Sequence, residues 1–271
     1  MESTSDSSCE YNVSNCENRN INPPKILKRI RRDKEDIMEA IDTPLKAVNL
    51  CKISYMDEEE YHQVSYKMKP VFVNGLVDMV YYTRDDILFI LFRGTDSIGD
   101  VMADINVGLT DTPNMGKIHS GFYNYWLEVV DLISSISAKH RYIKCYGHSM
   151  GGALATICSY YLTQMRPDRI VHCYTFGSPR VGDKCFASKF DKAVNVSRRY
   201  VNVMDPITHV PSMIRFKHVS GKFNLDTRGI ITRVLFNTMG LMGLRISKFH
   251  ILNHYEMLAK NYLNTIKNTR I

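Results

Sequence analysis

The sequence has no long apolar run. No stretch of 18 or more residues is both mostly apolar and free of charge, which argues against a helix that crosses a bilayer. The first 25 residues also lack the apolar core of a secretory signal peptide. Because both signals are missing, we expect a cytoplasmic protein that contacts a membrane or a lipid droplet only from its surface.

The cysteines form no recognisable pattern. There is no C-x-x-C pair and no zinc-ligand spacing, and an odd number excludes a complete set of disulfides. We therefore expect reduced, buried thiols, with no metal and no cofactor. The seven cysteines stand at positions 9, 16, 51, 145, 158, 173 and 185.

What is present fits one globular domain. A chain of 271 residues with 44% apolar residues can bury a sizeable core, and this composition excludes collagen, a coiled coil and a fully disordered chain. We interpret residues 1–34 as a disordered tail and basic arm, and residues 35–271 as the catalytic domain. The sequence gives no indication of the oligomeric state.

Most of the net charge of +7 comes from the basic arm. Six basic residues and one acid at positions 25–34 supply +5, and the rest is nearly balanced. A single cluster without interleaved aromatic residues favours a solvated helix face or a disordered arm over contact with an anionic membrane, a targeting receptor or RNA. We therefore expect no nucleic-acid partner.

From residue 70 onward, short apolar runs alternate with segments of helical spacing. This alternation predicts an α/β fold, with a mostly parallel central sheet covered by helices on both faces. The expected strands are VFVNG, LVDMVYYT and residues 87–92, 142–147, 170–177 and 200–205. The expected helices include FYNYWLEVVDLISSI and GGALATICSYYLTQM.

The pentapeptide GHSMG predicts a nucleophilic serine. It follows the strand-like YIKCY and leads into a helix-like segment, which is the setting in which G-x-S-x-G has chemical meaning. A serine on so sharp a turn has strained backbone angles, and glycine at 147 and 151 permits strand and helix to approach closely. Ser149 is the candidate nucleophile.

A serine hydroxyl needs a base, and the base needs an acid that orients it. In the chain order Ser, acid, His, the best-placed carboxylate is Asp205, at the end of the strand-like YVNVM. Two histidines, His250 and His254, open the last helix. We favour His250 as the base because the helix entrance gives it more freedom, while His254 stays open as the alternative. We expect His209 and His218, the other histidines in reach, to be structural.

Acyl transfer also needs two N–H donors for the oxyanion. Met150, after the nucleophile, is one candidate, and Thr95, in the turn FRGTD after the strand at 87–92, is the other. The next segment, residues 96–107, has an apolar stripe and is either a mobile flap or a fixed surface helix. Residues 229–246 are mostly apolar and either line an acyl cleft or contact a membrane, or form a buried helix.

Several separated blocks together resemble the class 3 (fungal-type) lipases of the α/β-hydrolase fold. They are FRGTDSIGDVMADI, IHSGF, GHSMGGALA, TFGSPRVGD and VNVMDPITHVP, and the resemblance covers roughly residues 70–262. It implies Ser149 as nucleophile, Asp205 as acid and Thr95 with Met150 as the oxyanion pair, and it aligns SIGDVMADI with the family's lid. It also favours His250, because the family's histidine is often followed by a tyrosine five positions on, here Tyr255.

The resulting prediction is a serine carboxyl-ester hydrolase, a lipase that cleaves acyl esters of lipids such as acylglycerols through an acyl-enzyme. A phospholipase or an esterase for soluble esters could use the same machinery. Outside the enzymes, the alternative is an inactive lipid-binding relative. Val101 stands where secreted fungal members often carry a tryptophan, and the disulfides of those members are missing.

Overall fold

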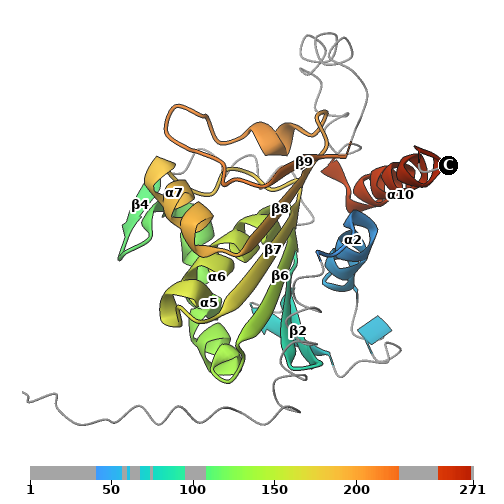
Figure 1. The fold of residues 1–271 in the computed structure, drawn as a ribbon. Helices are drawn as coiled ribbons and strands as arrows, with labels where there is room; N and C mark the ends of the chain where they lie inside the picture. The colour runs from blue at the N-terminus through green and yellow to red at the C-terminus, as the bar shows by residue number, and fades with distance from the viewer. Residues whose placement is uncertain are drawn as a thin grey trace, which may run out of the picture. The chain divides into compact units, whose positions relative to one another are not determined.

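A seven-stranded sheet organises the part of the chain that the computed structural model describes, which is residues 41–56, 60–61, 68–73, 76–94, 108–225 and 250–269. The strand order across the sheet is β1-β2-β3-β6-β7-β8-β9 (Figure 1). The strands are β1 Lys69–Val73, β2 Leu76–Arg84, β3 Ile87–Phe92, β6 Tyr142–His148, β7 Ile170–Phe176, β8 Val196–Val201 and β9 Lys222–Asn224. A separate hairpin consists of β4 Leu109–Thr112 and β5 Gly116–His119.

The sheet is mostly parallel, as predicted. The pairs β3–β6, β6–β7, β7–β8 and β8–β9 are parallel, and only β1–β2 and β2–β3 are antiparallel. One face carries α5 Ser120–Ser137, α6 Met150–Met165 and α7 Lys184–Ala193, whereas α2 Pro44–Ile53 and α10 Leu252–Thr269 lie on the other face (Figure 1). Both faces are thus covered, and the central strands can be apolar along their whole length.

The apolar pattern of the sequence explains this layering. All six residues of β3, ILFILF, are buried, as expected for a strand with a helix layer on each side. On α5, the buried residues Phe122, Trp126, Val129 and Ile133 recur at intervals of four, three and four, which places them on one face of the helix. That stripe packs in the main core cluster together with α6.

The strand expected at residues 200–205 has different bounds. Residues 200–205 were predicted as a strand, but β8 spans Val196–Val201 and Asp205 lies in the turn that follows. The first half of β8 contains Ser197 and Arg198, and the edge strand β9 pairs only with the second half, Arg199–Val201. Because this half is polar, the apolar pattern marks only its last residues.

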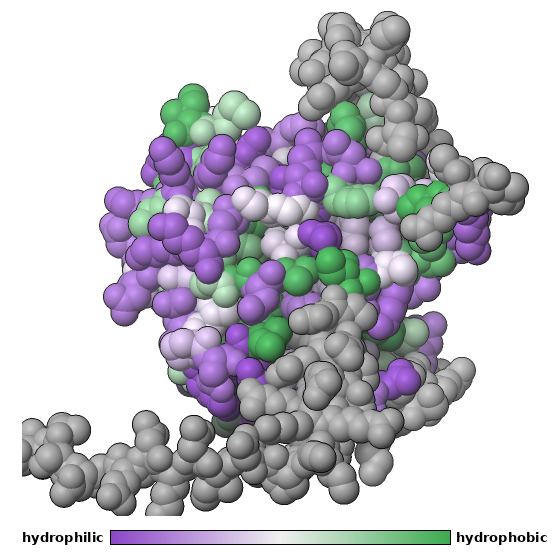
Figure 2. All heavy atoms as spheres, viewed as in Figure 1, coloured by the Kyte–Doolittle hydropathy of each residue, from purple (hydrophilic) through white to green (hydrophobic). Residues whose placement is uncertain are grey.

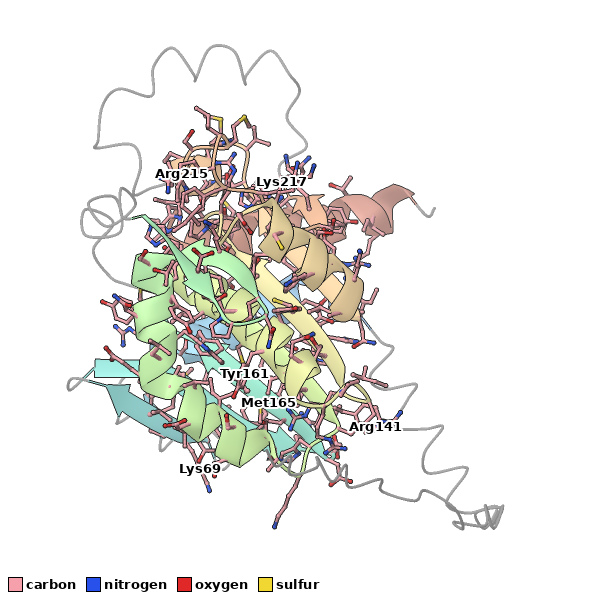
Figure 3. All side chains as sticks on the ribbon, turned by 90° about the vertical axis from the view of Figure 1, so that its left-hand side faces the viewer. Lys69, Arg141, Tyr161, Met165, Arg215 and Lys217 are labelled. Atoms are coloured by element: carbon pink, nitrogen blue, oxygen red, sulfur yellow. The ribbon has the colours of Figure 1, made fainter. Side chains whose placement is uncertain are left out.

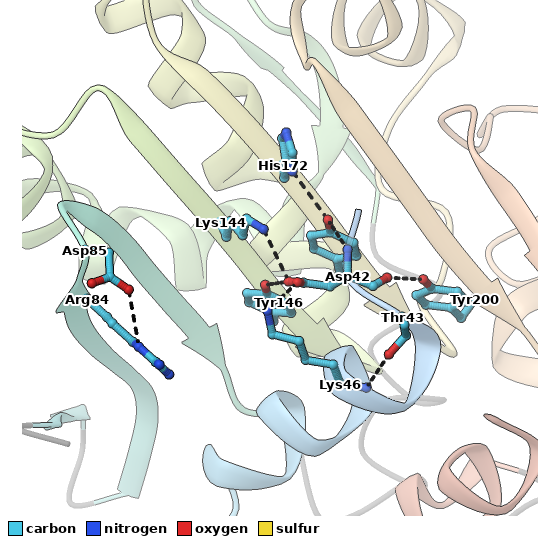
Figure 4. A network of polar contacts seen from close by, with 10 residues as sticks. Asp42, Thr43, Lys46, Arg84, Asp85, Lys144, Tyr146, His172 and Tyr200 are labelled. Atoms are coloured by element: carbon cyan, nitrogen blue, oxygen red, sulfur yellow. Dashed lines mark hydrogen bonds and ion pairs between the residues drawn. The ribbon is translucent and has the colours of Figure 1, made fainter. Parts of the chain in front are cut away.

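A polar network lies buried between the sheet and the start of α2 (Figure 4). The Asp42 carboxylate accepts hydrogen bonds from the Tyr146 hydroxyl and from Lys46 Nζ at 2.6 Å, and Lys144 Nζ lies 3.5 Å away. The Asp42 amide donates to the Tyr174 hydroxyl at 3.1 Å. Burial alone would raise the pKa of Asp42, but the hydrogen bonds and the Lys144 charge lower it overall. The network ties the start of α2 to the centre of the sheet.

Candidate active site

Ser149 lies on a strained turn between β6 and α6. Its backbone angles are φ 57° and ψ −127°, in a region that residues with a side chain rarely adopt. The turn is possible because the flanking glycines have no side chains: a Cβ on Gly147 would lie 2.0 Å from the Gly151 carbonyl oxygen, and one on Gly151 would lie 2.4 Å from the Phe92 carbonyl oxygen. The predicted strand–turn–helix setting of the serine is therefore present.

Asp205 and His250 form a buried pair. His250 Nδ1 lies 2.9 Å from Asp205 Oδ2, and the two residues are 2% and 0% exposed. The second carboxylate oxygen, Oδ1, accepts from the Ile207 amide at 3.0 Å, at the start of the 3-10 turn η1 Pro206–His209. The carboxylate is thus fixed by the turn on one side and can fix the imidazole ring on the other.

Tyr255 is a third donor to the same carboxylate. Its hydroxyl, on the first turns of α10, donates to Asp205 Oδ2 at 2.6 Å, and the side chain is fully buried. Burial, together with the Asp205 charge, raises the pKa of Tyr255 well above its ordinary value, so the phenol stays protonated and remains a donor. The family resemblance pointed to Tyr255 only through its spacing from His250, and its contact with Asp205 was not predicted.

Gly177 lies directly beside the pair. Its φ is +57°, and a Cβ there would lie 2.7 Å from Asp205 Oδ2 and 3.1 Å from His250 Nδ1. The residue before it, Phe176, accepts a hydrogen bond from the Ser149 amide at 2.9 Å. Residues 176 and 177 therefore connect the serine turn to the pair, all at the carboxyl ends of neighbouring parallel strands, where ligand sites of open α/β sheets form.

His148 links three parts of the site behind the serine. Its Nε2 lies 2.7 Å from the His250 carbonyl oxygen, and its Nδ1 lies 2.8 Å from the Tyr55 hydroxyl, which itself accepts from the Gly94 amide at 3.0 Å. A carbonyl only accepts, so Nε2 carries the proton and Tyr55 donates to Nδ1. Burial and the nearby His250 lower the pKa of His148 to about 3, which keeps the ring neutral.

The atoms expected to react are buried and are not engaged in other hydrogen bonds among the described residues. Ser149 Oγ and His250 Nε2 have no hydrogen-bond partner among the described residues, and Ser149 is 1% exposed. They do not hydrogen-bond to each other in this structure. Catalytic hydrogen bonds are often long without substrate and shorten when it binds. The assignment of their catalytic roles stays a prediction.

Three other histidines that follow Ser149 have different described contacts. His254 lies one turn further into α10, where its amide donates to the Ile251 carbonyl. His218 Nε2 contacts the Thr208 carbonyl oxygen at 2.7 Å. His209 has its carbonyl oxygen bound by the guanidinium of Arg180. His250, which the sequence favoured over His254, has its ring nitrogen bonded to Asp205.

Of the two residues expected to form the oxyanion hole, the structure describes only Met150. Met150 follows Ser149 and begins α6, where backbone N–H groups and the helix dipole favour negative charge. Thr95 lies outside the described residues. Its neighbour Gly94 is described and passes close to the serine: a Cβ there would lie 3.1 Å from Ser149 Cβ. Also outside the described residues are the flap at 96–107, the apolar stretch at 229–246, the arm at 1–34 and the predicted domain boundary, which all stay predictions.

Two general findings apply to the described residues alone. No helix in that part of the chain is long and apolar enough to span a bilayer, and no group of three metal-ligating side chains gathers there. Its five cysteines are free thiols, and all of them except Cys185 are buried.

Solved structures of lipases share the fold of this chain. The solved triacylglyceride lipase of Rhizomucor miehei has a TM-score of 0.56 and 22% identity, covering 72% of this chain and 80% of that one. A solved triacylglycerol lipase whose catalytic centre is reported as a serine-protease triad has a TM-score of 0.52 and 26% identity, covering 59% and 65%. The chain therefore has the α/β-hydrolase fold, as predicted.

Part of the sequence is also similar to known lipases. Residues 89–214 match the family described as lipase (class 3). A lipase of Rhizomucor miehei is 34% identical over 135 residues, which cover 46% of this chain and 37% of the relative, so the match spans well under two thirds of that protein. Residues 89–214 are thus similar to the class 3 lipases, and the predicted resemblance is confirmed.

Proposed function

We propose that this chain is a serine carboxyl-ester hydrolase that cleaves acyl esters of lipids such as acylglycerols. Ser149 is the nucleophile, His250 the general base and acid, and Asp205 the group that orients His250. The amides of Met150 and Thr95 form the oxyanion hole. The observation that carries the proposal is the buried Asp205–His250 pair beside a strained serine whose hydroxyl has no partner among the described residues.

The proposed reaction has two halves. Ser149 Oγ attacks the ester carbonyl while His250 Nε2 takes its proton, and His250 then returns the proton to the departing alcohol as the C–O bond breaks. In the second half, His250 deprotonates a water molecule, which attacks the acyl-enzyme and releases the fatty acid. The positive charge on His250 in each transition state is offset by Asp205, which Tyr255 and the Ile207 amide keep in position.

The similarity of residues 89–214 to the class 3 lipases supports a lipid ester as substrate. We propose contact with a lipid surface as part of the reaction, because a long-chain ester resides at an interface. We also propose a cytoplasmic location, which the free thiols of the five described cysteines support.

The test of the nucleophile is labelling of the full chain with a fluorophosphonate probe, followed by mapping of the modified peptide. We expect one label, on Ser149, and its loss in Ser149→Ala together with a fall of at least about a thousandfold in hydrolysis of a nitrophenyl ester. The matched control is Ser159→Ala on the same helix, because that buried hydroxyl donates to the Ala155 carbonyl at 2.7 Å and should not react.

Two outcomes would reject the proposal. Labelling of a residue other than Ser149 would remove the nucleophile assignment. No labelling and no ester hydrolysis by the folded parent chain would favour an inactive lipid-binding relative. With activity established, hydrolysis compared across chain lengths and head groups would separate an acylglycerol lipase from a phospholipase or an esterase for soluble esters.

A further inference from the structure

The loop between η1 and β9 carries two of the most exposed apolar side chains of the described residues. Met213 is 74% exposed and Ile214 is 90% exposed. Figure 2 shows an apolar projection above a mostly hydrophilic surface at this end of the molecule. Isolated apolar residues on a surface are common, but two adjacent ones at the tip of a projecting loop mark a contact site when the loop itself is held in place.

The loop is held at both ends. Before the tip, the buried Arg180 donates to the carbonyl oxygens of His209 and Pro211, the latter at 2.6 Å. After the tip, Phe216 is buried and the Lys217 amide donates to the Gly182 carbonyl at 2.8 Å. Because hydrogen bonds hold the loop on both sides of the tip, Met213 and Ile214 stay exposed to solvent.

Two basic side chains follow the tip. Arg215 and Lys217 are exposed, and neither forms an ion pair with a described residue. Figure 3 shows both at the same end of the molecule, far from Arg141 and Lys69. An apolar tip with adjacent cations matches the boundary of an anionic bilayer, where apolar groups enter the acyl region and cations remain among the headgroups.

We propose that residues 212–217, here called the docking loop, bind an anionic phospholipid surface by inserting Met213 and Ile214 while Arg215 and Lys217 contact the headgroups. Two apolar side chains are too few for a stable protein interface, which needs roughly 800 Å² from each partner. The loop follows Asp205 by only a few residues, so docking would bring the lipid to the carboxyl end of the sheet, where Ser149 lies. This last consequence rests on the proposed function; the binding does not.

The binding test uses the full chain with Ser149→Ala, so that vesicle lipids are not consumed. Partitioning onto phosphatidylcholine vesicles with about 30% phosphatidylserine is measured by sedimentation. We expect Met213→Ser with Ile214→Ser to lower the partition coefficient at least about tenfold. Arg215→Gln with Lys217→Gln should lower it roughly fivefold for each charge on these vesicles and have little effect on pure phosphatidylcholine.

The matched control is Leu127→Ser with Met165→Ser. These side chains are 52% and 41% exposed and lie on α5 and α6, away from the docking loop. The control should bind vesicles like the parent. Unchanged binding after loss of Met213 and Ile214 would overturn the proposal and leave the basic arm as the membrane contact. Loss of self-association in place of vesicle binding would overturn it in favour of a second copy of the chain.

A second readout separates docking from catalysis. With Ser149 intact, the Met213→Ser, Ile214→Ser variant should hydrolyse a dissolved short-chain ester at the parent rate and a vesicle-borne long-chain ester at least about tenfold more slowly at low lipid. If the parent hydrolyses neither ester, the proposed function fails while the vesicle measurement still tests docking. An equal loss on both esters would indicate damage to the site and overturn the docking role.

Discussion

Tyr255→Phe tests how much the site depends on the hydroxyl behind Asp205. The substitution removes one donor and keeps the aromatic ring, which packs edge-on against Phe176 at 5.7 Å and His148 at 6.1 Å between centroids. Asp205 then retains two described donors, the Ile207 amide and His250 Nδ1. The perturbation therefore weakens the support of the carboxylate without opening a large cavity.

The magnitude follows from the kind of bond that is lost. A hydrogen bond to a charged group contributes about 1.5–3 kcal/mol, and the 2.6 Å bond from Tyr255 to fully buried Asp205 is of this kind. The bond exists before and during the reaction, so only the part that orients Asp205 as His250 becomes charged affects the rate. We expect kcat to fall about tenfold, equivalent to about 1.4 kcal/mol, and the free energy of unfolding to fall by about 1–2 kcal/mol.

The assay is steady-state hydrolysis of a dissolved nitrophenyl ester together with urea unfolding. KM should stay near the parent value, because Tyr255 is buried behind Asp205. The control is Tyr262→Phe on the same helix, whose half-buried ring packs on Phe223 at 5.1 Å. A parent-like kcat in Tyr255→Phe, or a loss confined to KM, would refute the reasoning that the hydroxyl positions the acid.

Three further predictions concern Gly177, Tyr55 and the buried His172. Gly177→Ala should abolish hydrolysis while the chain still folds, because its Cβ would meet Asp205 Oδ2 at 2.7 Å; near-parent activity measured on the folded variant would contradict this. Tyr55→Phe should lower kcat several-fold by breaking the link between the Gly94 amide and His148, with retention of the parent rate as the opposing result. Burial, with a smaller effect of nearby charges, lowers the pKa of His172 to about 4, so its protonation favours the unfolded state and stability falls as pH drops from about 6.5 toward 4. Urea midpoints should show this fall, and His172→Asn should reduce its slope by up to about 1.4 kcal/mol per pH unit; an unchanged slope would refute it.

The central sheet was predictable because its strands are buried on both sides. An unbroken apolar run such as ILFILF gives a clear signal, and the glycines of GHSMG mark the turn without reference to any other part of the chain. The polar first half of β8 gave no such signal. Local sequence therefore predicts elements well where the surroundings are uniformly apolar.

The last helix shows the limit of periodicity. The spacing of Ile251, Tyr255, Leu258 and Tyr262 in the sequence is typical of one buried helix face, but Ile251 is 50% exposed and Leu252 is buried. The helix begins at Leu252, so Ile251 precedes its first turn and does not follow the helical spacing, whereas Tyr255 and Leu258 are buried as that spacing indicates. Periodicity marked the buried face of the helix but not the residue at which the helix begins.

The support of the site comes from helices at the two ends of the described chain. Tyr55 follows α2 and Tyr255 lies on α10, and the two helices are joined by an ion pair between Lys52 and Glu256 at 2.8 Å. One helix thus leads to the hydroxyl that bonds His148, and the other carries the hydroxyl that bonds Asp205.

These two hydroxyls make the geometry of His250 depend on both helices at once. His148 bonds the carbonyl of His250, and Asp205 bonds its ring, so a shift of either helix would move the imidazole relative to Ser149. A displacement of about 1 Å can cost about a hundredfold in rate even when all reacting groups remain. Separation of α2 from α10 should therefore reduce hydrolysis before the sheet unfolds. In a urea titration, activity would then be lost at a lower concentration than the far-ultraviolet circular dichroism, and coincident curves would show that the helix pair and the sheet unfold as one unit.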